Sequence, residues 1–153
     1  MKIETVEAIP VRLPRERERA QRTAGSPTSL EDSGSRYRWS STVPALYSIH
    51  FETALIKLTT DTGLVGWGES QAPLAPEVAC SIVEHLLTPV LLHADFDPGP
   101  EGIAELWEQM YRTMRVRGQT GGFMLDAISG VDIALWDLAG KHAEVPVCEL
   151  LTS

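Results

Sequence analysis

Apolar and polar side chains alternate in three segments of the first 70 residues, which is the pattern of half-buried strands. The segments are Ile3–Arg12, His50–Thr60 and Leu64–Glu69. In the second segment, Ala54, Ile56 and Leu58 fall on one face, while Thr53 and Lys57 fall on the other. The sequence therefore predicts three strands, each with one face toward a core.

Glycines mark two features of the predicted strands. Asp61-Thr62-Gly63 predicts a tight turn between the second and third strands, because glycine accepts the positive φ that such turns need. Gly66 and Gly68 lie inside the third strand, which indicates a bulge or the close approach of another backbone.

In the second half of the chain, apolar residues recur at helical spacing. Helices are predicted to begin at Pro76 and near Asp97, and a third is predicted over Phe123–Lys141; Pro89 ends or kinks the first. The third is apolar nearly all round, which predicts burial on several sides. Strands precede helices, so the expected class is α+β: a three-stranded antiparallel meander followed by a small helical bundle.

The segment 14–48 differs from the rest, because it is rich in Ser, Thr, Arg and Gly and shows no clear period. A connection of this length inside a compact domain is usually either functional or disordered. The length of 153 residues predicts one domain, which we place at 1–146 with 14–48 as a long loop.

The composition disfavours several classes of function. The net charge of −8 and a pI near 4.9 disfavour binding to nucleic acid or to an anionic membrane. No apolar run approaches the roughly 20 residues that cross a bilayer. Cys80 and Cys148 are far apart and form no CxxC motif, which favours a reduced, cytoplasmic protein.

No complete catalytic constellation emerges from the residues alone. Asp132 and Asp137 could be metal ligands, but five residues on a helix separate them by roughly 140°, so a structural role is favoured. Asp137 is expected to pair with Lys141, four residues on, and Asp132 to accept a hydrogen bond. Glu69 could be proposed as a general base, and Cys80, near a helix start, as a reactive thiolate. For both residues a structural role is favoured.

Other motifs give weaker signals. The four histidines show no zinc-ligand spacing, and the serines of the long loop lack a GxSxG elbow. Gly118–Gly122 does not match a phosphate-binding loop, so a flexible connection is the simpler interpretation. The arginines Arg112, Arg115 and Arg117 could attract an anionic substrate, although most surface arginines do not.

Two motifs in order carry a resemblance. Thr59–Glu69 ends in G-x-G-E, and Ala127–Lys141 reads A-x-x-x-x-D-x-A-x-W-D-x-x-G-K; Arg117-Gly118 and Gly121-Gly122 lie between them, and Pro146 with Leu150-Leu151 follows. Together they resemble the N-terminal capping domain of the enolase superfamily, of the mandelate racemase and muconate lactonizing type. The resemblance covers nearly the whole chain.

The resemblance implies that the catalytic groups lie in a second domain. In this family a (β/α)8 barrel supplies the Mg²⁺ ligands and the bases that abstract a proton α to a carboxylate. We therefore expect this chain to lack the barrel, with 147–153 as the start of the linker toward it. The resemblance implies no catalytic residue, metal ligand or cofactor here; Mg²⁺ would belong to the parent enzyme, an acid-sugar dehydratase (lyase) or a racemase (isomerase).

The resemblance also assigns a role to two loops, 14–48 and Ser70–Pro76, which in the family cover the barrel mouth and set specificity. The residues expected to face a sugar-acid or other carboxylate substrate are Arg22, Ser70 and Gln71. The expected partner is a missing or separately encoded barrel, and a homo-oligomer stays open. Alone, the chain is expected to be catalytically silent.

Two alternatives remain at this point: a stand-alone binding or interaction module, and a truncated product without function. The apolar character of Phe123–Leu138 and Val147–Leu151 favours the capping domain, because those faces would dock on a barrel.

Overall fold

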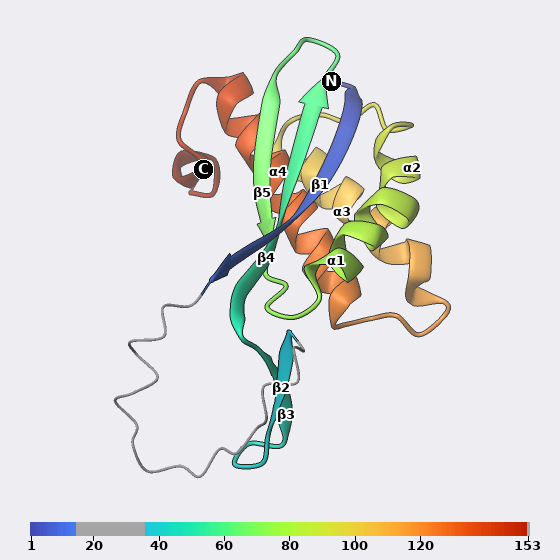
Figure 1. Cartoon of the computed structure of the whole chain (residues 1–153). Coiled ribbons are helices and arrows are strands. Elements are labelled where there is room, and N and C mark those ends of the chain that lie inside the picture. Colours follow the sequence, from blue (N-terminus) through green and yellow to red (C-terminus); the bar gives the residue numbers. More distant parts are fainter. Residues whose placement is uncertain (15–35, 153) are drawn as a thin grey trace.

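The computed structural model describes residues 1–14 and 36–152. It contains two antiparallel sheets, and its helices lie on one face of the larger one (Figure 1). The larger sheet has the strand order β1-β4-β5, and no closed barrel occurs among the described residues. The predicted α+β class, a three-stranded antiparallel meander followed by a small helical bundle, is confirmed.

The large sheet consists of β1 (Ile3–Pro14), β4 (His50–Thr60) and β5 (Val65–Ser70). Its central strand, β4, shows the predicted alternation, with Ala54, Ile56 and Leu58 at 0% exposure on the inner face. Ile56 lies opposite Ala8 of β1 and Gly68 of β5. One face of the sheet is therefore core, and the other faces outward.

The predicted turn between β4 and β5 is also confirmed. The Thr60 amide donates to the Leu64 carbonyl at 2.9 Å, and the Gly63 amide donates to the Thr60 carbonyl at 2.9 Å. Gly63 has φ 82°, a left-handed conformation that glycine adopts without a steric penalty.

A second hairpin lies within the segment predicted to lack a period. β2 (Tyr37–Ser40) pairs with β3 (Ala45–Ser48), so residues 37–48 of the predicted long loop contain a hairpin that the sequence did not indicate. Strands of four residues are too short to establish a period of two, which explains the miss. Residues 15–35 of the predicted loop lie outside the described residues.

The first helical run continues past the point where Pro89 was predicted to end or kink it. It comprises α1 (Pro76–Ile82), the π-helical turn η2 (Val83–Leu87) and α2 (Thr88–Leu91). Pro89 has no amide hydrogen to donate to an earlier carbonyl. The Thr88 amide and hydroxyl both donate to the Val83 carbonyl, five residues back, so the helix widens here instead of ending.

α4 (Phe123–Ala143) packs on the inner face of the sheet, with α3 (Pro100–Arg115) and α1 beside it. Its residues Val131, Leu135 and Leu138 have 0% exposure, as the all-round apolar pattern predicted. A short helix, α5 (Val147–Leu150), follows and contacts α4. Within the described residues, no helix combines the length and the hydropathy that crossing a bilayer requires.

Glycines let α4 and β5 approach backbone to backbone. A Cβ atom added at Gly68 would lie 2.7 Å from the Ala134 nitrogen and would overlap the Gly130 carbonyl oxygen. A Cβ atom on Gly130 would lie 2.8 Å from the Ser70 nitrogen. The close approach predicted from the glycines of this strand is therefore confirmed.

The outer edge of β5 is capped by two side chains of α4. The Asp137 Oδ2 atom accepts hydrogen bonds from the Trp67 amide at 2.8 Å and from Lys141 Nζ at 2.7 Å. Lys141 Nζ also donates to the Val65 carbonyl at 2.8 Å. The predicted pair of Asp137 and Lys141 is confirmed, and it satisfies backbone groups that the sheet leaves unpaired.

Candidate functional site

Several segments meet at one end of the large sheet, the lower end in Figure 1. Here β1 ends, β4 begins, β5 ends and the hairpin β2–β3 lies. The connection 71–75, which joins β5 to α1, crosses the same end and contacts the hairpin through Tyr37. The described parts of the two loops that the sequence linked to substrate are thus neighbours in space.

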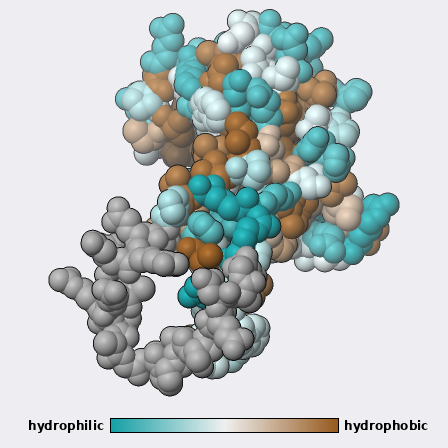
Figure 2. Space-filling view, viewed as in Figure 1, coloured by the Kyte–Doolittle hydropathy of each residue, from teal (hydrophilic) through white to brown (hydrophobic). Residues whose placement is uncertain are grey.

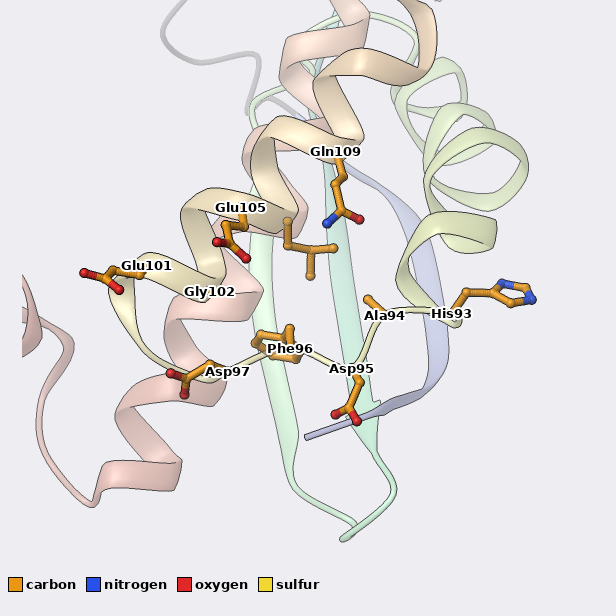
Figure 3. Close-up of a pocket in the computed structure, with 10 residues that line it drawn as sticks. His93, Ala94, Asp95, Phe96, Asp97, Glu101, Gly102, Glu105 and Gln109 are labelled. Carbon is orange, nitrogen blue, oxygen red and sulfur yellow. The ribbon is translucent and has the colours of Figure 1, made fainter.

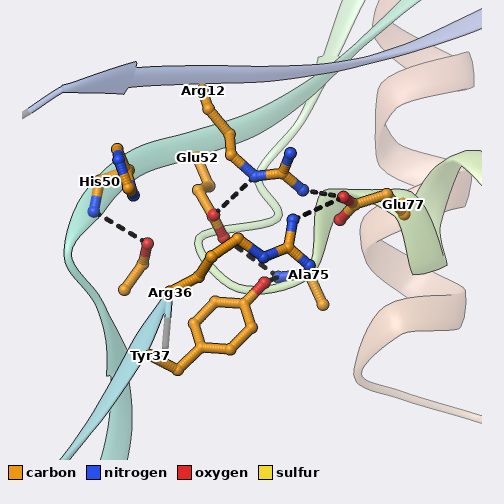
Figure 4. A network of polar contacts seen from close by, with 8 residues as sticks. Arg12, Arg36, Tyr37, His50, Glu52, Ala75 and Glu77 are labelled. Carbon is orange, nitrogen blue, oxygen red and sulfur yellow. Dashed lines mark hydrogen bonds and ion pairs between the residues drawn. The ribbon is translucent and has the colours of Figure 1, made fainter. Parts of the chain in front are cut away.

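A buried carboxylate, Glu52, lies at the centre of this end (Figure 4). Its side chain has 0% exposure. Glu52 Oε1 accepts from Arg12 Nε at 2.9 Å, and Oε2 accepts from the Ala75 amide at 3.2 Å. The Ala75 amide also donates to the Tyr37 hydroxyl at 2.9 Å. One carboxylate therefore joins β1 to the 71–75 connection, and Tyr37 brings the hairpin into the same contact.

A second carboxylate, Glu77 in the first turn of α1, extends the network toward solvent. Its Oε1 atom accepts from Arg36 Nη1 at 2.9 Å and also pairs with Arg12. The Arg36 guanidinium lies 5.4 Å from the centre of the Tyr37 ring. Glu77 and Arg36 are partly exposed, so solvent screens their attraction; Glu52, which is fully buried, depends more on its partners.

Of the three residues predicted to face a substrate, the structure describes Ser70 and Gln71, and it places their side chains differently. Gln71 is exposed in the 71–75 connection. Ser70 has 0% exposure, and its hydroxyl lies against Gly130 of α4, so its contact with a substrate stays a prediction that burial does not support. Arg22 lies outside the described residues. A period-two pattern could have placed Ser70 correctly, because it shares the inner face with Gly66 and Gly68.

Sequence reasoning missed Glu52, Tyr37 and Glu77, because they are scattered along the chain and no motif joins them. One signal was present: Glu52 continues the inward-facing series of β4, two residues before Ala54. A carboxylate on a core-facing position needs a buried partner, and Arg12 lies opposite it in the register of β1 and β4.

Asp132 is half-buried on α4, and burial raises the pKa of its carboxyl above the ordinary 3.8. Within the described residues, none donates a hydrogen bond to it, so the hydrogen bond predicted for it is not found. Burial likewise raises the pKa of Asp126, one helical turn and a half earlier. In the folded chain the charged form of Asp132 is therefore destabilising.

Replacing Asp132 with asparagine should stabilise the fold at neutral pH. The carboxyl has a higher pKa in the folded chain than in the unfolded chain. Stability therefore falls as the pH rises from the unfolded-state pKa through the folded-state pKa. Asp132→Asn should therefore raise the free energy of unfolding most at pH 7 and not at all below about pH 3.8. The increase should stay below about 1 kcal/mol, because the side chain is half-exposed. Urea unfolding between pH 3.5 and 7 measures it; Glu105→Gln, an exposed carboxylate on α3, is the control and should show no gain.

The other residues weighed as catalytic take structural positions. Glu69 accepts a hydrogen bond from the Thr53 hydroxyl at 2.7 Å across the β4–β5 pair. Cys80 is buried, and burial raises the pKa of its thiol, which makes it less reactive. The structural interpretation of both residues is supported.

An acidic groove of about 370 Å³ lies between residues 93–97, which follow α2, and α3 (Figure 3). Asp95, Asp97, Glu101 and Glu105 line it, but Asp97 and Glu101 point away from its centre. In the described part of the chain, no three His, Cys, Asp or Glu side chains are placed to share an ion. The residues described here therefore do not fit a Mg²⁺ site.

Apolar side chains are exposed on the outer face of the large sheet, the side that Figure 2 views, and also on the hairpin. Leu13 and Phe51 are each 59% exposed and lie opposite each other across β1 and β4. Trp67 of β5 and, on the hairpin, Trp39 and Leu46 are also exposed. α4 is mostly covered within this chain, so its apolar character does not by itself indicate docking on a barrel.

Comparison with known proteins extends this description. A family model for the N-terminal domain of mandelate racemase/muconate lactonizing enzyme matches residues 39–152. The D-galactonate dehydratase of Verminephrobacter eiseniae is 42% identical over 96 residues, which cover 63% of this chain and 23% of that protein. This chain thus spans about a quarter of the length of that relative.

Solved structures agree with the fold. A member of the enolase superfamily from Agrobacterium tumefaciens superimposes with a TM-score of 0.81 at 29% identity, over 99% of this chain and 37% of that one. A racemase from Streptomyces coelicolor with bound magnesium superimposes with a TM-score of 0.65 at 26% identity, over 92% and 32% of the two chains. The chain therefore belongs to the mandelate racemase/muconate lactonizing enzyme family, as an N-terminal capping domain of the enolase superfamily.

Proposed function

We propose that this chain is the substrate-capping and specificity domain of a Mg²⁺-dependent enzyme, an acid-sugar dehydratase or a racemase, and that it is catalytically silent alone. The observation that carries the proposal is the likeness over 99% of this chain to about a third of an enolase-superfamily protein. The other two thirds of such an enzyme would hold Mg²⁺, which supplies charge stabilisation when a proton α to a carboxylate is removed.

The geometry supports a capping role. The 71–75 connection and the hairpin β2–β3 lie at one end of the sheet, and Gln71 is exposed there. We propose that Gln71 and Arg22 face the substrate, whose carboxylate suits an arginine fork. The identity to a D-galactonate dehydratase favours a sugar acid as the substrate class. The exposed apolar side chains of the hairpin and the outer sheet would be covered by the remainder of the enzyme.

A chimera tests the proposal. Residues 1–152 would replace the matching N-terminal part of the Verminephrobacter eiseniae D-galactonate dehydratase, and turnover of D-galactonate would be measured with Mg²⁺. We expect the chimera to exceed the same enzyme without its N-terminal part by on the order of a hundredfold, because a cap positions the substrate and excludes water. This chain alone should show no turnover.

Two results would contradict the proposal. Turnover by this chain alone, abolished by EDTA, would show that the catalytic groups lie within it. A chimera that is folded and soluble but no more active than the barrel alone would show that this domain does not serve as its cap. If neither result is found, a panel of acid sugars assayed with the active chimera would define the substrate class.

A further inference from the structure

We propose that Glu52 is a positioning residue, which locks the 71–75 connection and the hairpin β2–β3 into one unit by holding Ala75 in a strained backbone conformation. The network of Figure 4 and the backbone of Ala75 support the locking, whatever the function of the chain. Its consequence for a substrate rests on the proposed function, because that function places the 71–75 connection at the substrate.

Ala75 has an unusual backbone. Its φ of 49° and ψ of 56° place it in the left-handed helical region, which residues with a Cβ atom rarely adopt. The next residue is Pro76, and a proline favours extended backbone in the residue before it. Two local preferences therefore oppose this conformation, and contacts from elsewhere in the fold must maintain it.

Those contacts come from Glu52 and Tyr37. The Ala75 amide is shared between Glu52 Oε2 at 3.2 Å and the Tyr37 hydroxyl at 2.9 Å. Hydrogen bonds to a charged, buried acceptor are stronger than neutral ones, and Glu52 has 0% side-chain exposure. The conformation of the connection is thus set by one residue of β4 and one of the hairpin.

The other contacts of the network hold Glu52 and the hairpin that carries Tyr37 in place. Arg12 Nε, 2.9 Å from Glu52 Oε1, compensates the buried charge and orients the carboxylate, so that its other oxygen meets Ala75. Arg36, which precedes β2, donates to Glu77 in the first turn of α1 at 2.9 Å. The hairpin region therefore contacts the connection at Ala75, through Tyr37, and the start of α1 at Glu77, through Arg36. If Glu52 loses its charge, the connection and the hairpin should loosen together.

Amide hydrogen exchange, measured by NMR on this chain, tests the locking without any assay of activity. In Glu52→Gln, the Ala75 amide and the Ile49 amide, which pairs with Arg36, should exchange about tenfold faster or more. The core amides of β4 and β5 should change little. Glu69→Gln, an exposed carboxylate on β5, is the matched control and should leave the Ala75 amide within about twofold of wild type.

Two further variants make the test specific. Ala75→Gly, which removes the strain, should restore protection at position 75 when added to Glu52→Gln. Tyr37→Phe removes one acceptor and keeps the buried charge, so it still tests the lock if Glu52→Gln fails to fold; it should speed exchange at Ala75. Unchanged exchange at Ala75, or a uniform rise across all core amides, would overturn the proposal.

The chimera described above links the lock to substrate. There, Glu52→Gln should raise KM or lower kcat, with a total loss of about tenfold in kcat/KM, while the unfolding midpoint of the chimera stays close to its parent. If the exchange results hold and the chimera is inactive, the proposed function fails and the lock stands. An active chimera that is insensitive to Glu52→Gln would overturn the proposed consequence for substrate.

Discussion

Replacement of Gly68 with valine is expected to prevent folding, and replacement with alanine to cost about 3 kcal/mol. The reason is the backbone contact between β5 and α4. The first atom of any side chain at position 68 would overlap the Gly130 carbonyl oxygen and lie 2.7 Å from the Ala134 nitrogen. Neither backbone group can rotate away as a side chain would, so α4 would have to move off the sheet and open the core.

Gly121 offers the control for this experiment. It has no positive φ, and a Cβ atom there would meet nothing within 4 Å, so Gly121→Ala should change the free energy of unfolding by less than about 0.5 kcal/mol. Urea unfolding followed by circular dichroism measures all three variants. A Gly68→Ala protein as stable as wild type would show that α4 does not rest directly on the β5 backbone.

The second large effect is expected at Leu58, on the inner face of the central strand. It has 0% exposure, so Leu58→Ala removes apolar contacts and leaves a cavity, with an expected loss of about 3 kcal/mol. Leu55 lies on the same strand but on the outer face, where it is only partly buried. Leu55→Ala should therefore cost below about 1 kcal/mol under the same unfolding conditions.

The comparison between these two leucines also tests the outer face. Equal losses at both positions would mean that the outer face is as well covered in solution as the core, contrary to the exposure of Leu13 and Phe51. Repeating the unfolding experiment at several protein concentrations would then identify a covering second copy, because association makes stability concentration-dependent.

Much of the fold follows from local patterns. The bounds of β4 and the face it buries come from alternation alone, because an isolated run of eleven residues is long enough to show the period. The close approach of α4 to β5 was indicated by the glycines of β5. The hairpin β2–β3 was missed because each strand has only four residues, and only β2 alternates between apolar and polar side chains.

The candidate site was less predictable, because its contacts join distant parts of the chain. Arg12 and Glu52 are 40 residues apart, and only the register of β1 and β4 brings them together. The left-handed backbone of Ala75 could not be expected before a proline, since local preference opposes it. Asp137 and Lys141 were paired correctly from their spacing, but their role on the edge of β5 depends on how α4 lies across the sheet.

That edge has a consequence for how copies of this chain could associate. Asp137 accepts from the Trp67 amide and Lys141 donates to the Val65 carbonyl, so this part of the β5 edge is closed to a strand from a neighbour. At the opposite side, β1 carries Pro10 and Pro14, which lack amide hydrogens. Both margins therefore carry features that disfavour the growth of a continuous intermolecular sheet.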